Sequence, residues 1–420
     1  MSNTETTDKD LHWKILVGIS LGIFVSFSLH DIQGGAEWAQ AYIKPFGTIF
    51  IRLLQLMAIP LLLTSLITGI AGMRSLDHLG KLGGRTLLLF TFTCITSTTI
   101  GVLLASIIQP GSFVPADLRQ ELFTSYSSDV SQFVDAKNNQ PLGFFQMLVQ
   151  WVPSNIFYAL GQNSMMLSIV LFSILFGIAA CQVPSYQTKP VIDFLEGLQE
   201  IFMKMVLLIM KIAPFGVFAL IASISLNWSL LTSLFIYIVT VVIGLSIILF
   251  ILYPAVFTLI GKTGYRFFFK MMQPAFLTAF STSSSAATLP VTMNRVTEGL
   301  KVKKEPAHFI LSLGTTINMD GTALYQAIAA IFMAQVVGID LSWLDMLTII
   351  VTCTLAAVGA AGVPGAGMIT LMIVLQSVHV PVEAIALIMA PDRLLDMFRS
   401  LVNVAGDATA AVALGEKETE

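Results

Sequence analysis

The sequence predicts an all-α polytopic membrane protein with eight transmembrane helices and two re-entrant hairpins. Of its 420 residues, 55% are hydrophobic and only 11% are charged, which is not the composition of a soluble domain. Several apolar runs reach the roughly 20 residues needed to cross the hydrocarbon core of a bilayer. The last of these runs carries polar residues on one helical face, namely Asp396, Arg399, Ser400, Asn403 and Asp407.

Six apolar runs come first along the chain. Hydropathy predicts helices over 13–30, 45–73, 84–109, 145–182, 197–225 and 229–258. A polar, mainly acidic insert at 110–144 separates the third helix from the fourth and is expected to be extracellular. Lysines and arginines gather instead in three other connections, around Arg85, Arg266 and Lys303. The positive-inside rule assigns these three connections to the cytoplasm.

After Lys262, small and polar residues interrupt the apolar runs. The segment 267–295 lies between cytoplasmic charges, so it is predicted to enter and leave from the inside, as a re-entrant hairpin with Ser283–Ser285 at its tip. The segment 346–379 is predicted to do the same from the outside, with Gly359–Gly367 at its tip. Non-helical backbone at membrane depth must be buried in protein or line a wet cavity. Helices over 306–337 and 381–414 complete the eight crossings and leave both termini in the cytoplasm.

The motif Asn318–Thr322 alternates polar side chains at a spacing of two, which a regular helix would point in different directions. An unwound turn would let Asn318, Asp320 and free carbonyl oxygens surround a hard cation, which prefers oxygen ligands. The alternative is a helix softened by glycine, whose polar groups hydrogen-bond to neighbouring helices.

The two hairpin tips differ in chemistry. The serines at 281–285 offer hydroxyl and amide groups near a helix N-terminus, which suits a carboxylate, although serines in membrane helices often bond back to the preceding turn. The second tip holds four glycines and Pro364, so it cannot form a stable helix. It suits a gate that opens and closes over a ligand, or a close-packed interface of small residues.

The polar face of the last helix predicts a ligand with two acidic groups and one amine. Arg399 can take a carboxylate in a bidentate fork, Asp396 can hold an ammonium group, and Asn403 can donate to a second carboxylate. Asp407 is placed for a cation. The alternative is an internal Asp396–Arg399 ion pair with no substrate. Asp392 and Arg393, nearer the outer end, are expected at the membrane interface.

These motifs resemble the dicarboxylate/amino acid:cation symporter family, the glutamate transporters and their prokaryotic homologues. The resemblance covers nearly the whole chain and rests on the segments Arg52–Pro60, Ala213–Ala219, Thr288–Pro290, Asn318–Thr322, Ala361–Gly365 and Asn403–Asp407. It implies a glutamate-transporter-like elevator fold in a homotrimer. The scaffold would comprise helices 1–2 (13–73) and helices 4–5 (145–225). Helix 3 (84–109), helix 6 (229–258), both hairpins, helix 7 (306–337) and helix 8 (381–414) would form the moving transport domain.

The resemblance also implies the roles of individual residues. Arg399 and Thr322 would bind the substrate side-chain carboxylate, and Asp396 and Ser400 its amino group. Asn403 and Ser285 would bind the main carboxylate, with backbone help from Ser283 and Val363. Three sodium ions would lie among oxygens of Gly314, Asn318, Asn403 and Asp407, then of Thr316, Ala357, Val358 and Ala360, and lastly of Thr93, Asn318 and Asp320.

The expected function is sodium-coupled uptake of L-aspartate or L-glutamate across the inner (plasma) membrane. Partners would be the acidic amino acid, co-transported sodium, the lipid bilayer and two further copies of the chain, with no nucleic acid. No catalytic residue is assigned, and an intramembrane hydrolase is disfavoured because no histidine falls near the serines. The rival is a proton-coupled transporter of glutamate or C4-dicarboxylates. Phe90 and Cys94 favour this rival, because they replace a tyrosine and a hydroxyl beside the third sodium of relatives.

Overall fold

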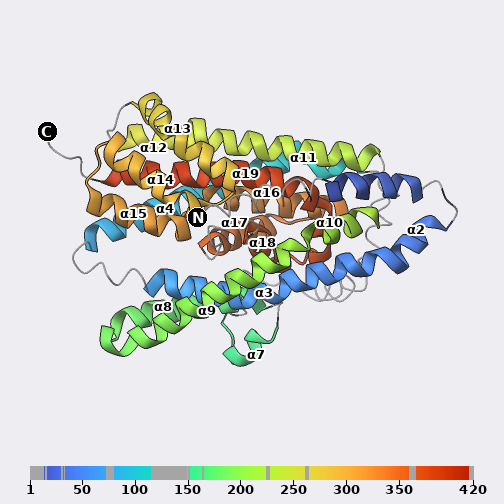
Figure 1. Ribbon diagram of the computed structural model, residues 1–420, viewed down its shortest axis with the longest axis horizontal. Helices are drawn as coiled ribbons and strands as arrows, with labels where there is room; N and C mark the ends of the chain where they lie inside the picture. Colours follow the sequence, from blue (N-terminus) through green and yellow to red (C-terminus); the bar gives the residue numbers. More distant parts are fainter. Residues whose placement is uncertain are drawn as a thin grey trace.

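The computed structural model describes residues 14, 17–29, 32, 34–71, 80–114, 149, 152–162, 165–223, 228–260, 264–358 and 366–415. Nearly all of these residues are helical, which confirms the predicted all-α class. Figure 1 shows an elongated bundle in which the longer helices run roughly along the long axis of the molecule.

The first three helices follow the hydropathy of the chain. Residues 17–29 form one helix. α2 (Gly35–Trp38) and η1 (Ala39–Ile43) lead into α3 (Lys44–Ala71), and α4 (Gly80–Ile108) is followed by η3 (Pro110–Phe113). After Val114, the insert expected up to residue 144 lies outside the described residues.

The run predicted as one helix over 145–182 is divided. α7 (Ile156–Leu160) is a separate short helix, and α8 (Met166–Gln182) begins after it. Asn155 caps α7, because its side-chain oxygen accepts hydrogen bonds from the backbone N–H groups of Phe157 and Tyr158 at 2.9 and 3.3 Å. This cap starts a new helix at a point where hydropathy alone sees no boundary.

The prediction of one helix over 197–225 also misses a break. α9 (Ser185–Lys211) starts earlier than expected, and α10 (Ala213–Ala222) leaves it at an angle of 52°. Pro214 lies in the first turn of α10. Proline has no N–H for the preceding turn and its ring clashes there, so the helix bends.

The run predicted over 229–258 is a continuous rod with one irregular turn. α11 (Trp228–Ile247) passes through the π-helical turn η5 (Ile248–Leu252) into α12 (Tyr253–Leu259). Pro254 is the second residue of α12, just after this turn. A π turn inserts an extra residue, so it rotates the side chains that follow it about the helix axis.

The second half of the chain is built from broken helices, as the sequence predicts. α13 (Tyr265–Thr282) meets α14 (Ser285–Asn294) at Ser283–Ser284, and η6 (Arg295–Gly299) follows. α15 (Lys304–Ile317) and α16 (Asp320–Val337) are separated by Asn318 and Met319. α17 (Trp343–Val358) and α18 (Ala366–Ser377) flank a glycine-rich tip that lies outside the described residues at 359–365. The chain ends in η7 (Val382–Ala384) and α19 (Ile385–Leu414).

Within the described part of the chain, four helical segments are long and apolar enough to cross a membrane. They are Ala39–Ala71, Leu82–Phe113, Leu230–Leu259 and Lys304–Val337, and the bent pair α9–α10 would make a fifth. Shorter apolar helices include 17–29, 168–182 and the arms at 343–357 and 367–377. This is the architecture of a multi-pass membrane protein.

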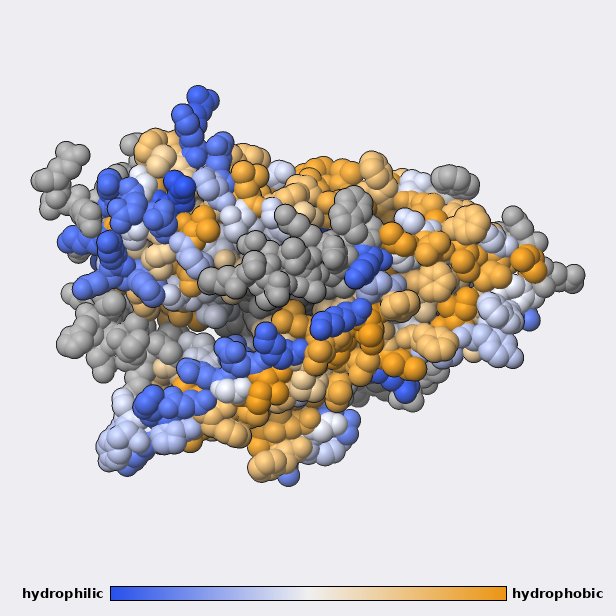
Figure 2. All heavy atoms as spheres, viewed as in Figure 1, coloured by the Kyte–Doolittle hydropathy of each residue, from blue (hydrophilic) through white to orange (hydrophobic). Residues whose placement is uncertain are grey.

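Burial is most complete in α16, at the centre of the bundle. In α16 every residue except Gln335 is buried, and α16 packs against α4, α17 and α19. Large apolar side chains are exposed on the outer helices, such as Leu88, Ile107 and Phe215. Figure 2 shows apolar residues over much of the visible surface, with hydrophilic residues gathered at the end where α12, α13 and α15 meet. An apolar exterior of this kind suits lipid rather than water.

Candidate functional site

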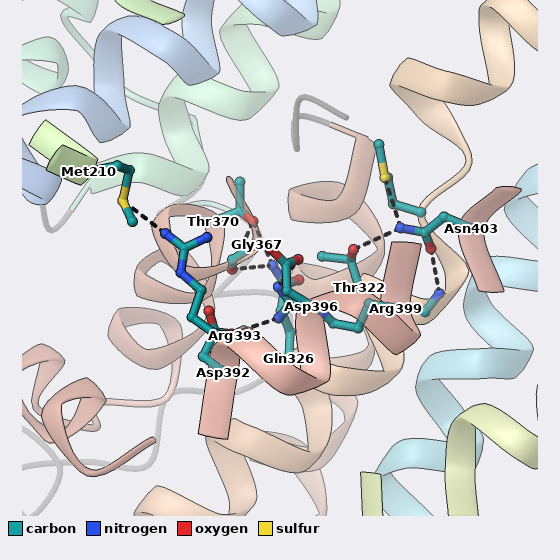
Figure 3. A network of polar contacts seen from close by, with 12 residues as sticks. Met210, Thr322, Gln326, Gly367, Thr370, Asp392, Arg393, Asp396, Arg399 and Asn403 are labelled. Carbon is teal, nitrogen blue, oxygen red and sulfur yellow. Dashed lines mark hydrogen bonds and ion pairs between the residues drawn. The ribbon is translucent and has the colours of Figure 1, made fainter. Parts of the chain in front are cut away.

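The buried face of α19 carries an arginine held by two carboxylates. Arg399 Nη1 lies 3.0 Å from Asp392 Oδ1, and Arg399 Nη2 lies 2.5 Å from Asp396 Oδ1. The Arg399 side chain is only 1% exposed. Buried charges of this kind are stable only with partners and are typical of binding sites in membrane proteins. The internal Asp396–Arg399 pair considered from the sequence is therefore present, but it is part of a larger network (Figure 3).

Asp392 corrects a sequence prediction. It was expected at the membrane interface, yet it is 1% exposed and bonded to Arg399. Asp392 lies seven residues before Arg399, so the two share a helical face, and that spacing could have revealed the contact. Its neighbour Arg393 is also buried but turns away from the network, with Nη2 3.5 Å from Met210 Sδ of α9 (Figure 3).

Two residues of α16 that the sequence reading did not single out complete the surroundings of Arg399. The guanidinium carbon lies 4.0 Å from the centre of the Tyr325 ring, a cation–π contact. The Gln326 side-chain amide donates to the Gly367 carbonyl at 3.2 Å and to Thr370 Oγ1 at 2.6 Å. Because Gly367 has no side chain, the backbone of α18 can lie against the guanidinium, where a Cβ atom would be 3.1 Å from Nη2.

One turn along α19, Asn403 joins α19 to the start of α16. Its Oδ1 accepts a hydrogen bond from the Gly321 N–H at 2.9 Å, which satisfies a free donor at the helix N-terminus. Its Nδ2 donates to Thr322 Oγ1 at 3.1 Å and also lies 3.2 Å from Met319 Sδ. The predicted substrate residues Thr322, Asp396, Arg399, Ser400 and Asn403 are all buried, and Figure 3 shows four of them (Thr322, Asp396, Arg399 and Asn403) around the α16–α19 contact.

The predicted unwound turn is present and faces Asp407. Asn318 (φ −95°, ψ 88°) and Met319 (φ −119°, ψ 52°) both leave helical geometry. Asn318 Nδ2 donates to Asp407 Oδ1 at 3.0 Å, while Asn318 Oδ1 is buried with no hydrogen-bond partner among the described residues. Gly314 is required beside them, because a Cβ atom there would collide with Asp407 Oδ1. The result is a compact group of oxygen atoms suited to a hard cation.

A second oxygen-rich group surrounds Asp320, the first residue of α16. Thr93 Oγ1 of α4 donates to Asp320 Oδ1 at 3.1 Å, and the Tyr253 hydroxyl of α12 donates to Asp320 Oδ2 at 3.0 Å. Asp320 has no exposed surface. Thr93 and Asp320 were predicted as cation ligands, whereas Tyr253 was not. Tyr253 is remote in sequence, and no spacing rule connects it to Asp320.

The serine tip between α13 and α14 lies against α19. Ser283 adopts a left-handed conformation (φ 50°), and its buried hydroxyl oxygen has no hydrogen-bond partner among the described residues. Ser284 caps α14, since its hydroxyl oxygen accepts from the Ala287 N–H at 3.1 Å. Ser285 is buried at the first position of α14. The Phe280 and Phe398 rings meet edge-on with centroids 5.1 Å apart, which fixes α13 beside Arg399.

The structure gives less support for the remaining predicted cation ligands, which lie near Thr316 and the second hairpin tip. Thr316 is half-buried and donates to the Leu313 carbonyl at 2.9 Å, and Ala357 packs with Cys94 and Met319. Val358 ends α17, and its side chain is not described. Ala360 and Val363 lie outside the described residues. Phe90 and Cys94 are both buried on α4, and neither offers a hard oxygen ligand.

The sequence profile of the sodium:dicarboxylate symporter family matches residues 11–417, almost the entire chain. This chain is a member of the sodium:dicarboxylate symporter family. It is 34% identical over 411 residues to the proton/sodium-glutamate symport protein of Bacillus caldotenax, covering 97% of this chain and 94% of the relative. It is 31% identical over 414 residues to the proton/glutamate-aspartate symporter of Escherichia coli (97% and 93%). It is 35% identical over 459 residues to excitatory amino acid transporter 3 of Oryctolagus cuniculus (97% and 87%).

Membership in the sodium:dicarboxylate symporter family confirms the resemblance seen in the sequence and makes the chain a transporter rather than an enzyme. The family comprises cation-coupled symporters of glutamate and aspartate, and its relatives are named for proton, sodium or both. At 31–35% identity these names do not decide which cation this family member uses.

Proposed function

We propose that this chain is a sodium-coupled symporter that carries L-aspartate or L-glutamate into the cell. The observation that supports this most directly is the buried Arg399, which is held only by Asp392, Asp396 and an aromatic face within the described residues. A guanidinium in this setting recognises a carboxylate by bidentate hydrogen bonds. An intramembrane arginine of this kind has no role in a passive apolar scaffold.

The neighbouring residues complement the rest of an acidic amino acid. Asp396 and Ser400 would take the ammonium group, and Thr322 would assist Arg399 at the side-chain carboxylate. Asn403, Ser285 and the backbone of Ser283 and Val363 would hold the main carboxylate. The α14 N-terminus favours this assignment, because free N–H groups and the helix dipole attract an anion.

Two groups of oxygen atoms support sodium as the coupling ion. One is formed by Asn318 and Asp407 beside Gly314, and the other by Asp320 and Thr93. A further site would use backbone oxygens near Thr316, Ala357, Val358 and Ala360. Oxygen-only donor sets with carboxylates suit a hard cation better than the thiol of Cys94 does.

The proposed mechanism is an elevator movement in a homotrimer of the inner (plasma) membrane, with both termini in the cytoplasm. In this mechanism α13–α19, α4 and α11–α12 would move together past a scaffold made of 17–29, α3 and α8–α10. The bend between α9 and α10 and the tight contact of α3 with α10 favour a rigid scaffold, since Gly216 leaves no room for a Cβ atom beside Phe50. The α13–α14 and α17–α18 pairs would be the two re-entrant hairpins.

Uptake into proteoliposomes tests this proposal. Radiolabelled L-aspartate and L-glutamate are offered with an inward sodium gradient and, separately, with an inward proton gradient alone. We expect uptake with sodium only, together with a mutual increase in affinity between sodium and substrate, because linkage is reciprocal. Uptake with protons alone would favour the second candidate, a proton-coupled transporter of glutamate or C4-dicarboxylates, which is supported by Phe90 and Cys94 beside Asp320.

A further inference from the structure

The irregular turn in the α11–α12 rod brings a tyrosine to the cation group of Asp320. The Tyr253 side chain is completely buried, and its hydroxyl lies 3.0 Å from Asp320 Oδ2 and 3.1 Å from the Val402 carbonyl of α19. The hydroxyl has one proton and two acceptors within reach. It can therefore donate to either acceptor and turn its oxygen lone pairs toward the other side.

The backbone around Tyr253 explains why it points inward. The Tyr253 N–H donates to the Ile248 carbonyl, five residues earlier, so the turn is π-helical. In the same pattern the Leu249 carbonyl would receive the N–H of residue 254, but that residue is a proline and has none. The Tyr265 hydroxyl of α13 donates to the Leu249 carbonyl instead, at 2.6 Å. A side chain from a neighbouring helix thus provides the hydrogen bond that the π turn lacks.

A second observation comes from α19. Gly406 lies opposite the Tyr253 hydroxyl, and a Cβ atom at this position would lie 2.5 Å from the hydroxyl oxygen and 2.8 Å from Asn318 Nδ2. The chain therefore has a glycine where the phenol enters the space between Asp320 and Asp407. Residues of three separate elements (α12, α16 and α19) thus surround one hydroxyl closely. This indicates that the hydroxyl has a specific place beside the Asp320 carboxylate.

We propose that Tyr253 is a positioning residue of the cation site at Asp320. With Thr93 on one carboxylate oxygen and Tyr253 on the other, the Asp320 carboxylate is held in one orientation before the cation arrives. On cation binding at Asp320, the Tyr253 hydroxyl would rotate so that it donates its hydrogen bond to the Val402 carbonyl, and its oxygen lone pairs would face the cation. A hydroxyl from α12 thereby takes the place of the one that Phe90 and Cys94 do not provide.

This inference rests on the proposed sodium coupling, and the Tyr253→Phe variant tests it. The purified variant is reconstituted in proteoliposomes, and aspartate uptake is measured as a function of sodium concentration. We expect the sodium concentration for half-maximal uptake to rise by roughly tenfold, the effect of losing one hydrogen bond to a charged group. The maximal rate and the substrate KM at saturating sodium are expected to stay within about twofold of wild type, which shows that the variant is folded.

Tyr186→Phe is the control. It also removes a phenol hydroxyl, but this hydroxyl belongs to an exposed residue of α9, where it accepts a hydrogen bond from Gln187 Nε2 at 3.0 Å and makes no contact with Asp320. Its sodium dependence is expected to match the wild type. If Tyr253→Phe and wild type share the same sodium dependence, or if Tyr186→Phe shifts it equally, the inference on Tyr253 is wrong. If wild-type uptake does not depend on sodium at all, the proposed function fails first, and this inference fails with it.

Discussion

At the scale of single residues, the site is defined by buried polar groups that pair with one another. Arg399, Asp392 and Asp396 form one group, and Asn318 with Asp407 forms another. Breaking one member of a buried charge pair costs more than the pair contributes, because the remaining charge stays buried and uncompensated. Substitutions here are therefore expected to act on substrate and ion affinity far more strongly than substitutions on the surface.

Arg399→Gln is expected to abolish uptake of acidic substrates. Truncating one partner of a buried hydrogen-bonded charge pair costs roughly 2–5 kcal/mol, so aspartate affinity is expected to fall by at least ~30-fold. Radiolabelled aspartate binding to the purified protein measures this loss. Arg393→Gln removes a buried positive charge that contacts Met210 and not the Arg399 network, so substrate affinity is expected to be retained. Unchanged aspartate transport in Arg399→Gln would contradict the site assignment.

Asp407→Asn is expected to weaken sodium binding and leave folding intact. The substitution keeps the shape of the side chain and its contact with Asn318, but it removes the charge that attracts the cation. We expect the half-saturating sodium concentration to rise at least ~10-fold, the equivalent of about 1.4 kcal/mol. Asp193→Asn serves as the control, since that carboxylate is 54% exposed and only pairs with Lys189. Equal sodium dependence in the two variants would remove Asp407 from the cation site.

At the scale of helices, function depends on where helices stop. α15 ends and α16 begins around Asn318–Met319, and α13 ends at Ser283 in a left-handed conformation. These breaks direct free backbone groups and short polar side chains to one region between α16 and α19. The α9–α10 bend and the π turn before Pro254 have another role, because they set the direction of whole helices.

Gly314→Ala tests the close approach of α15 to α19. The added Cβ atom would collide with Asp407 Oδ1, so the carboxylate must move away from Asn318. Overpacking of this kind typically costs about 1–3 kcal/mol. We expect most of this cost to appear as a higher sodium concentration for half-maximal uptake. Gly197→Ala is the matched control, because nothing lies within 4 Å of the added atom in α9. A wild-type sodium response in Gly314→Ala would show that Asp407 is free to shift without loss.

Helix breaks that are marked by clusters of polar residues could be predicted from the sequence. The alternation in Asn318–Thr322 and the serine run at 281–285 indicated non-helical backbone, and the spacing from Asp396 to Asp407 indicated one polar face. Asp392 could have been added by the same spacing rule. The π turn and Tyr253 could not, because their effect depends on Tyr265, Asp320 and Gly406, which come together only in the folded chain.

At the scale of the whole molecule, the proposed scaffold and the proposed moving group would meet at an interface that contains Arg393. In the proposed elevator, α19 belongs to the moving group and α9 to the scaffold, and Arg393 Nη2 contacts Met210 Sδ at 3.5 Å across this boundary. A small cavity beside it is lined mainly by apolar residues of α3, α10 and α18, together with Asp392. The described residues that line this cavity are mainly apolar, which would let the two proposed groups slide past one another at low enthalpic cost.

Cross-linking across this boundary tests the relative movement. The pair Met210→Cys and Arg393→Cys, in a Cys181→Ser background, is joined by a short bifunctional thiol reagent. We expect the joined protein to lose uptake while it still binds substrate, because the two groups can no longer pass one another. Proteoliposome uptake and substrate binding on the same sample measure the two effects.

The control pair lies inside the proposed moving group. Ser106 of α4 and Met346 of α17 are in contact, with Ser106 Oγ 3.8 Å from Met346 Sδ. Joining cysteines at these positions is expected to leave uptake within about twofold, because both residues belong to the proposed moving group and keep their separation when it moves. Full uptake in the joined Met210–Arg393 pair would rule out an elevator movement across this interface.

The paired carboxylates around Arg399 also bear on leakage. The arginine is neutralised by two anions tethered to its own helix, and their effective concentration far exceeds that of any amino acid in solution. A substrate that arrives alone must compete with these tethered anions. In the proposed symport, bound cations would supply the additional free energy that tips this competition, so we expect little amino acid to cross without them. The internal ion pairs would thus act as a threshold that prevents accumulated substrate from flowing back down its gradient.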